Sequence, residues 1–228
     1  MYKVVTQIDK NLEKVCNEDG KKIIFINSKD ALKGFFVVCD GLGGHKNGRA
    51  SSEFLSNYIL KHCCESELEK IVLDANKQMA ENDNMGLTTV SALLMEFSQR
   101  KASIVNVGDS RIYYFKQGQS GRQISKDDSS LKIIMDAYNI SEAEAHEHPR
   151  YVITNVVGSN LCRPRIQEID FDDGDAFVLI TDGAYLRLEI IFAREYTFSS
   201  IRELIDDMER ELVQKEAADN ATILIVSV

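Results

Sequence analysis

The chain has 228 residues, of which 44% are hydrophobic, and it carries a net charge of −9 with a pI of about 5.0. This length suits one generous domain with a sizeable core, and no repeat or Gly/Ser/Pro-rich linker divides it, so we expect a single domain over 1–228. The acidic balance and the lack of a basic stripe argue against a nucleic-acid partner. No window approaches the roughly 18 apolar residues of a membrane span, and no signal-peptide stretch is present. We therefore expect a cytoplasmic monomer that does not contact a membrane.

Short β-like runs alternate with a few helical patterns along the chain. Runs rich in β-branched and aromatic residues predict strands, and apolar residues at helical spacing predict helices. In chain order we expect strands at 22–27 and 34–39, helices at 50–61 and 67–79, strands at 88–97, 102–107 and 111–115, a helix at 129–138, strands at 165–171 and 176–181, a helix at 199–215 and a strand at 221–228. Several strands follow one another across short turns, which favours antiparallel pairing. The pattern predicts an α+β fold of two packed, mainly antiparallel sheets, a β-sandwich flanked by helices.

The five cysteines do not form a recognisable framework. Their number is odd and no C-x-x-C spacing occurs, so neither a disulfide scaffold nor a zinc knuckle is supported. We expect free, mostly buried thiols in a reducing compartment. Cys39 lies inside an apolar strand run, which indicates a small core residue and not a nucleophile.

Three predicted strands end on an aspartate next to a small residue. The run 34–39 leads into Asp40-Gly41, 103–107 leads into Gly108-Asp109-Ser110, and 177–181 leads into Asp182-Gly183. In a mirrored arrangement, Asp219-Asn220 precedes the last strand. One such Asp-Gly is most often a turn, but strands of one sheet system can bring several of them to the same edge. Close carboxylates repel by about 4 kcal/mol per pair at an intermediate dielectric, so the pattern indicates a site for Mg²⁺ or Mn²⁺, which prefer oxygen ligands.

Six sequence blocks occur in an order that resembles a known family. They are VVCDGLGG at 37–44, GLTT at 86–89, VNVGDSR at 105–111, KDDS at 126–129, VLITDG at 178–183 and DNATI at 219–223. Together with Asn17-Glu18-Asp19, these blocks resemble the metal-dependent Ser/Thr protein phosphatases of the protein phosphatase 2C type, in their compact bacterial form. The resemblance covers the chain from about residue 15 to its last residue, and six ordered blocks are a far more specific signal than one Asp-Gly.

The resemblance implies roles for individual residues at one end of a β-sandwich. The family binds two divalent cations, Mg²⁺ or Mn²⁺, at this end, and its bacterial members bind a third. By this resemblance Asp40 would bridge two ions, and Gly41 would offer its carbonyl to one of them. Asp182 and Asp219 would complete one ion's shell, while Asp19 and Glu18 would act mainly through coordinated waters. Asp109 would bind the third ion, with Asp128 near it. Asp40, Asp182 and Asp219 form the implied catalytic set. A metal-bridging hydroxide would attack phosphorus in line, with no Cys or Ser nucleophile and no phosphoenzyme.

The chain also departs from the family pattern. Lys14 stands where an Arg often contacts the substrate phosphate, and lysine supplies charge but no bidentate fork. Tyr151 and Asn155 replace the usual Asn and Arg, and Ala184 replaces a Leu after the third Asp-Gly. No general acid can be assigned. The divergent segment 127–164, which corresponds to the flap beside the family's active site, is a candidate specificity element; we call it the flap-like segment.

Three functions are compatible with these observations. The first is metal-dependent hydrolysis of phosphoserine and phosphothreonine in proteins, opposing a Ser/Thr kinase in bacterial signalling. The second, which the departures motivate, is a catalytically weak or inactive phosphatase-like regulator that binds metal or a phosphoprotein. Retention of every core metal position argues against this second function. The third treats the acidic clusters as turns and solvated ends in a scaffold protein, and we rank it well below the others.

Overall fold

Two antiparallel sheets of five strands each form the centre of the molecule. The computed structural model describes residues 3–10, 19–27, 32–43, 47–63, 67–140, 152–186, 188, 200–214 and 220–228. The first sheet contains, in spatial order, β1 (Lys3–Lys10), β10 (Ala221–Ser227), β9 (Ala176–Ile180), β6 (Arg111–Phe115) and β7 (Arg122–Gln123). The second contains β2 (Asp19–Asn27), β3 (Leu32–Asp40), β4 (Val90–Glu96), β5 (Lys101–Val107) and β8 (Arg165–Asp170).

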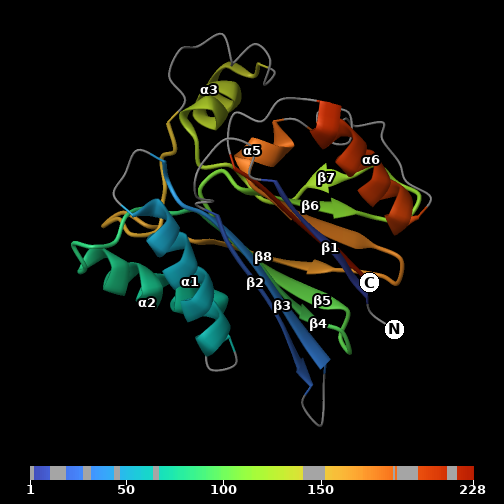
Figure 1. The fold of residues 1–228 in the computed structure, drawn as a ribbon, viewed down its shortest axis with the longest axis horizontal. Coiled ribbons are helices and arrows are strands. Elements are labelled where there is room, and N and C mark those ends of the chain that lie inside the picture. The colour runs from blue at the N-terminus through green and yellow to red at the C-terminus, as the bar shows by residue number, and fades with distance from the viewer. Residues whose placement is uncertain are drawn as a thin grey trace.

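Helices cover the outer faces of both sheets. Figure 1 shows α1 (Gly48–His62) and α2 (Leu68–Ala80) on one side of the sandwich, and α5 (Asp182–Tyr185) and α6 (Ile201–Gln214) on the other. α3 (Ser130–Tyr138) projects beyond the ends of the strands. Side chains of α1 and α2 share one buried cluster with the second sheet, and side chains of α5 and α6 share another with the first. The result is a four-layer α/β/β/α arrangement.

The sequence GFFVVC in β3 is apolar at successive positions because the strand is buried on both of its faces. Phe35 and Val37 belong to the cluster under α1 and α2, whereas Phe36 and Val38 belong to the cluster between the two sheets. Successive side chains of a strand point to opposite faces, so a strand buried on both faces needs apolar residues at every position. The same division separates Val178 from Phe177 in β9.

The predicted sandwich is confirmed, and the predicted strands and helices agree with the structure to within three residues at their ends. The pattern does not predict β1, β7 or α5. β2 begins at Asp19, three residues before the predicted strand. Cys39 and Cys63 are buried, as expected, while Cys162 is partly exposed. Within the described ranges every helix is too short or too polar to cross a lipid bilayer. The single-domain boundary at 1–228 stays a prediction.

Removing the aromatic ring of Phe177 from the cluster between the sheets should destabilise the protein strongly. Phe177 is fully buried there and packs against Phe171 and Tyr114, with ring centroids 6.0 and 5.1 Å away. We expect Phe177→Ala to lower the free energy of unfolding by about 3–5 kcal/mol, because it removes buried surface and leaves a cavity. In urea titrations, the control Tyr138→Ala, at a side chain that is 72% exposed, should change that energy by less than about 0.5 kcal/mol. Equal losses in the two variants would contradict this description of the core.

Candidate active site

The end of β3 brings Asp40 to an edge of the second sheet, opposite the beginning of β2. In the strand register Asp40 faces Asp19. The backbone of Asp40 is held by two threonines: its N–H donates to Thr89 Oγ1 (3.0 Å), and its carbonyl accepts from Thr89 N (2.8 Å) and Thr88 Oγ1 (2.8 Å). Gly41 follows as a buried residue bridged to Thr88. These contacts fix the backbone that carries the half-buried Asp40 side chain.

A crossing of three residues joins the two sheets at this same end. Residues 108–110 connect the last residue of β5, in the second sheet, to Arg111, the first residue of β6 in the first sheet. Arg111 is paired with Ile180, the last residue of β9, and Asp182 follows two residues later. The ends of β3, β5 and β9 thus lie at one end of the sandwich, and each is followed by, or ends on, an aspartate. Their gathering was predicted from the repeated strand pattern and is what the topology requires.

Buried hydroxyl and amide groups fasten this crossing. The Ser110 hydroxyl is hydrogen-bonded to Thr89 Oγ1 (2.8 Å), the same oxygen that accepts from the Asp40 N–H. The Ser110 carbonyl accepts from Ser91 Oγ (2.9 Å) and Asn106 Nδ2 (2.8 Å). Asn106 and both serines are at most 2% exposed. Since a buried polar group without a partner is costly, this network favours one geometry for the crossing.

Asp182 begins the short helix α5 and is half-buried. Its Oδ1 accepts from the N–H of Gly183 at 2.7 Å, which orients the carboxylate. Ala184 and Tyr185 of the same helix are buried against the first sheet. The Tyr185 ring lies under the guanidinium of Arg111, 3.8 Å from its centroid, so β6 helps to hold the helix that carries Asp182.

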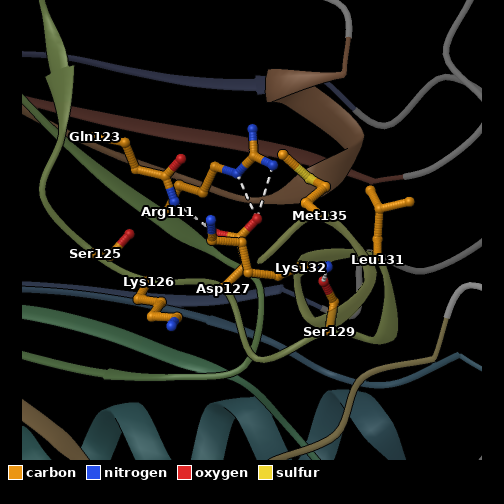
Figure 2. Close-up of a pocket in the computed structure, with 9 residues that line it drawn as sticks. All are labelled: Arg111, Gln123, Ser125, Lys126, Asp127, Ser129, Leu131, Lys132 and Met135. Atoms are coloured by element: carbon orange, nitrogen blue, oxygen red, sulfur yellow. Dashed lines mark hydrogen bonds and ion pairs between the residues drawn. The ribbon is translucent and has the colours of Figure 1, made fainter. Parts of the chain in front are cut away.

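Arg111 also forms a buried ion pair with Asp127, at the start of the flap-like segment. Arg111 Nε and Nη2 donate to Asp127 Oδ2 at 2.9 and 2.7 Å, and Gln123 Nε2 donates to Oδ1 at 2.6 Å. Although burial opposes the charged guanidinium, Tyr185, Tyr113 and Asp127 raise the pKa of Arg111. The pair lines a pocket of about 230 Å³, to which Leu131 and Met135 of α3 also contribute; Figure 2 shows the residues that line it. The pair links the flap-like segment to β6 and, through Tyr185, to α5.

Asp109 and Asp128 are both buried near the crossing. Asp109 is 1% exposed and Asp128 is 3% exposed. Asp128 accepts from the N–H of Gly108 (3.3 Å), from Asn155 Nδ2 (2.7 Å) and from Arg165 Nε (2.9 Å). Asp128 is thus surrounded by protein donors, and its predicted place near a third metal ion stays a prediction.

The structure describes only part of the predicted ligand set. It places the side chains of Asp40, Asp109, Asp128 and Asp182, and it gives the strand position of Asp19. The expected residues Lys14, Glu18 and Asp219 lie outside the described residues, as does Tyr151. In the described part of the chain, no three His, Cys, Asp or Glu side chains form a group able to hold a metal ion. The donors that are described, two half-buried carboxylates and the Gly41 carbonyl, are nevertheless the hard oxygen ligands that suit Mg²⁺ and Mn²⁺.

The Cys162 thiol is not set up for nucleophilic chemistry. Burial, and next the negative charge of Asp128, raise the pKa of the Cys162 thiol to about 12. Cys162 is therefore protonated at neutral pH and is a poor nucleophile.

Several residues that build the site were not given a role by the sequence. Thr89, Ser110 and Asn106 fasten the strand ends, and Arg111 and Arg165 neutralise Asp127 and Asp128. Most lie inside blocks that carry the resemblance, such as GLTT and VNVGDSR, so their place in these blocks could have indicated that they belong to the site. Arg165 lies outside every block and had none.

A sequence profile described as protein phosphatase 2C matches residues 13–220. The chain belongs to the protein phosphatase 2C family. It is 28% identical over 190 residues to the serine/threonine protein phosphatase PstP of Mycobacterium tuberculosis, which covers 77% of this chain but only 35% of that protein. It is also 28% identical to the serine/threonine phosphatase Stp of Listeria innocua, over 92% of this chain and 89% of that protein. The predicted family is confirmed.

Solved structures support the fold. The serine/threonine phosphatase of S. agalactiae aligns over 100% of both chains with a TM-score of 0.81 and 22% identity. The catalytic domain of PstP, in complex with two manganese ions, aligns over 97% of this chain and 96% of that domain, with a TM-score of 0.71 and 21% identity. These likenesses establish the shared sandwich.

The tight contact between the crossing and Thr89 yields a prediction about Gly108. Gly108 has a φ of +98°, and a Cβ there would lie 2.7 Å from Thr89 Cγ2. We expect Gly108→Ala to lower the free energy of unfolding by about 2–4 kcal/mol, because backbone strain adds to a steric clash with the threonine that holds Asp40. Gly118→Ala is the matched control, since its φ is +72° and nothing lies within 4 Å of its Cβ. Urea titration should show only about 1 kcal/mol of strain in the control, and similar losses in both variants would refute the clash.

Proposed function

We propose that this protein hydrolyses phosphoserine and phosphothreonine in proteins with the aid of divalent cations, and that it opposes a Ser/Thr kinase in a bacterial signalling pathway. The observation that carries the proposal is the meeting of three aspartate-bearing strand ends at one end of a protein phosphatase 2C sandwich. The bacterial relatives are named as serine/threonine phosphatases. Because the chain spans about a third of PstP, nothing of that longer protein's partners is transferred.

The proposed cation site uses oxygen ligands from several elements. Asp40, the Gly41 carbonyl, Asp182, Asp219 and Asp19 would hold two Mg²⁺ or Mn²⁺ ions, with Glu18 acting through water and Asp109 at a third ion. When bound, these cations would stabilise negative charge on the phosphoryl group and lower the pKa of the attacking water. Manganese is present in the complex of the structurally similar PstP domain.

The chain's own residues contribute orientation. Before any ligand arrives, the threonine contacts fix the backbone that carries Asp40, and the Gly183 N–H orients the Asp182 carboxylate. Such preorganisation spares the site the cost of ordering side chains during the reaction. Lys14 would supply positive charge to the substrate phosphate. The cytoplasmic location and monomeric state also belong to this proposal.

Loss of a single carboxylate charge at Asp40 tests the function. With Mn²⁺ present, we expect the protein to release phosphate from a phosphothreonine peptide, and EDTA to abolish the release. Asp40→Asn and Asp182→Asn should each lower kcat/KM by at least about 100-fold, because removing one group that stabilises transition-state charge has this effect in other enzymes. Asp74→Asn, at an exposed residue of α2, is the matched control and should retain full activity.

Two results would count against the proposal. A folded wild-type protein that releases no phosphate with Mn²⁺ or Mg²⁺ would exclude the enzyme. If that protein still binds the phosphopeptide tightly, the alternative of a phosphatase-like regulator is supported instead.

A further inference from the structure

The carboxylate of Asp128 is surrounded by four donors. Oδ1 accepts from Nε of Arg165 at 2.9 Å and also from its Nη2, while Oδ2 accepts from Asn155 Nδ2 at 2.7 Å and from Gly108 N at 3.3 Å. An ionised carboxylate offers about four lone-pair sites, so its accepting capacity is filled by protein groups. This filling leaves little capacity for a cation, in contrast to the role near a third ion that the resemblance implies.

Asp128 joins three segments that are distant in the sequence. Its backbone N–H donates to the Gly108 carbonyl (2.9 Å), and its own carbonyl accepts from Thr154 N (2.8 Å). Its side chain reaches Asn155, in the returning part of the flap-like segment, and Arg165, the first residue of β8. The crossing that carries Asp109, the end of the flap-like segment and the edge of the second sheet therefore meet at one residue.

Asn155 also connects Asp128 to the backbone of Arg163 and so closes the loop between residues 155 and 163. Its Nδ2 also donates to the Arg163 carbonyl (2.9 Å), and its Oδ1 accepts from Arg163 N (3.0 Å). The amide of Asn155 thus bonds the backbone on one side and Asp128 on the other. This is the position at which the family usually has an Arg, and here the positive charge next to Asp128 comes from Arg165.

Charge balance explains why Arg165 matters. The Asp128 side chain is 2% exposed, and a buried carboxylate is strongly destabilising without a cation or several donors. The Arg165 side chain is 51% exposed, so it provides that charge while staying in contact with water. Arg163, two residues earlier, is also exposed but contributes only its backbone to these bonds.

We propose that Asp128, Asn155 and Arg165 form a clasp that fixes the end of the flap-like segment to the Asp109 crossing, and that Asp128 is a positioning residue and not a metal ligand. Its kinetic consequence rests on the proposed function: the clasp holds the flap-like segment in the position in which it contacts the substrate protein. Opening the clasp raises KM for a phosphopeptide more than it lowers kcat.

Hydrogen exchange tests the clasp without any turnover. In metal-free protein, Arg165→Gln is expected to speed amide exchange in 152–158 by roughly tenfold, because Asp128, which bonds Thr154 and Asn155 of this segment, loses its charged partner. Arg163→Gln is the matched control, since it removes the same charge two residues away, and its exchange should equal that of the wild type. Unchanged exchange in Arg165→Gln, or equal acceleration in both variants, would overturn the proposal.

A double-mutant cycle and a metal titration separate the clasp from metal ligation. If the clasp exists, Asp128→Asn with Arg165→Gln accelerates exchange no more than the larger single change, because both remove one interaction. Calorimetric titration with Mn²⁺ should give Kd values within about threefold for wild type, Asp128→Asn and Arg165→Gln. A loss of tenfold or more in Asp128→Asn alone would make Asp128 a ligand and refute the proposal.

Kinetics with a phosphothreonine peptide complete the test. Arg165→Gln should raise KM about fivefold with a smaller change in kcat, the pattern of lost binding and not of lost chemistry. Arg165→Lys keeps the charge but not the planar fork. Its KM and its exchange rate should therefore lie between those of Arg165→Gln and the wild type. If no variant releases phosphate but Arg165→Gln still loosens 152–158, the clasp stands and the proposed function fails. If turnover is normal and KM does not change, the link between the clasp and the substrate is wrong.

Discussion

The structure depends on one constraint, the passage of the chain from one sheet to the other in three residues. Residues 108–110 link β5 to β6, and at about 3.3–3.6 Å per residue they can span little more than the roughly 10 Å between packed sheets. The end of β5 and the beginning of β6 must therefore lie at the same end of the sandwich. In the second sheet, β4 begins beside the end of β5 and also beside the end of β3, because both pairs are antiparallel. In the first sheet, the beginning of β6 pairs with the end of β9, so all these ends lie at the same end of the sandwich. The strand ends that carry Asp40, Asp109 and Asp182 therefore lie at one end of the sandwich as a consequence of topology.

The polar groups at this end have a physical reason to be there. Along their lengths β3, β6 and β9 are buried on both faces, so polar side chains in the middle of these strands would be costly. At the strand ends the apolar layers stop, and backbone groups of the crossing need partners. Asn106 and Ser91 satisfy the Ser110 carbonyl, and Thr89 is hydrogen-bonded to the Ser110 hydroxyl. The network that satisfies the buried backbone also fixes the atoms to which Asp40 is attached, so stability and preorganisation come from the same contacts.

Much of this arrangement could be predicted from the sequence, because its signals are local. A strand buried on both faces followed by Asp-Gly is visible in the residues themselves, and its repetition indicated that the aspartates gather. The missed elements carry weaker signals: β1 is a largely polar strand at the sheet edge, β7 has two residues and α5 has four. The partners of Asp128 could not be predicted, because Asn155 and Arg165 lie 27 and 37 residues away. Side-chain pairs at such separations follow from the packing and not from any periodicity.

The two aspartates at the start of the flap-like segment show how its position is coupled to both sheets. Asp127 takes its counter-charge from Arg111 in the first sheet, whereas Asp128 takes it from Arg165 in the second. Because these two aspartates are consecutive in the chain, one Asp-Asp pair binds both sheets at once. Through Arg111 the segment reaches α5, and through Gly108 it reaches the crossing that carries Asp109.

The departures from the family pattern that the structure describes fit this scheme. Asn155 belongs to the attachment at Asp128, and Ala184 is fully buried in the packing of α5. Both residues take part in the attachment of neighbouring elements, and neither replaces an expected carboxylate. A change of this kind bears first on how the substrate protein is positioned, since the backbone that holds Asp40 and Asp182 is fastened by other residues.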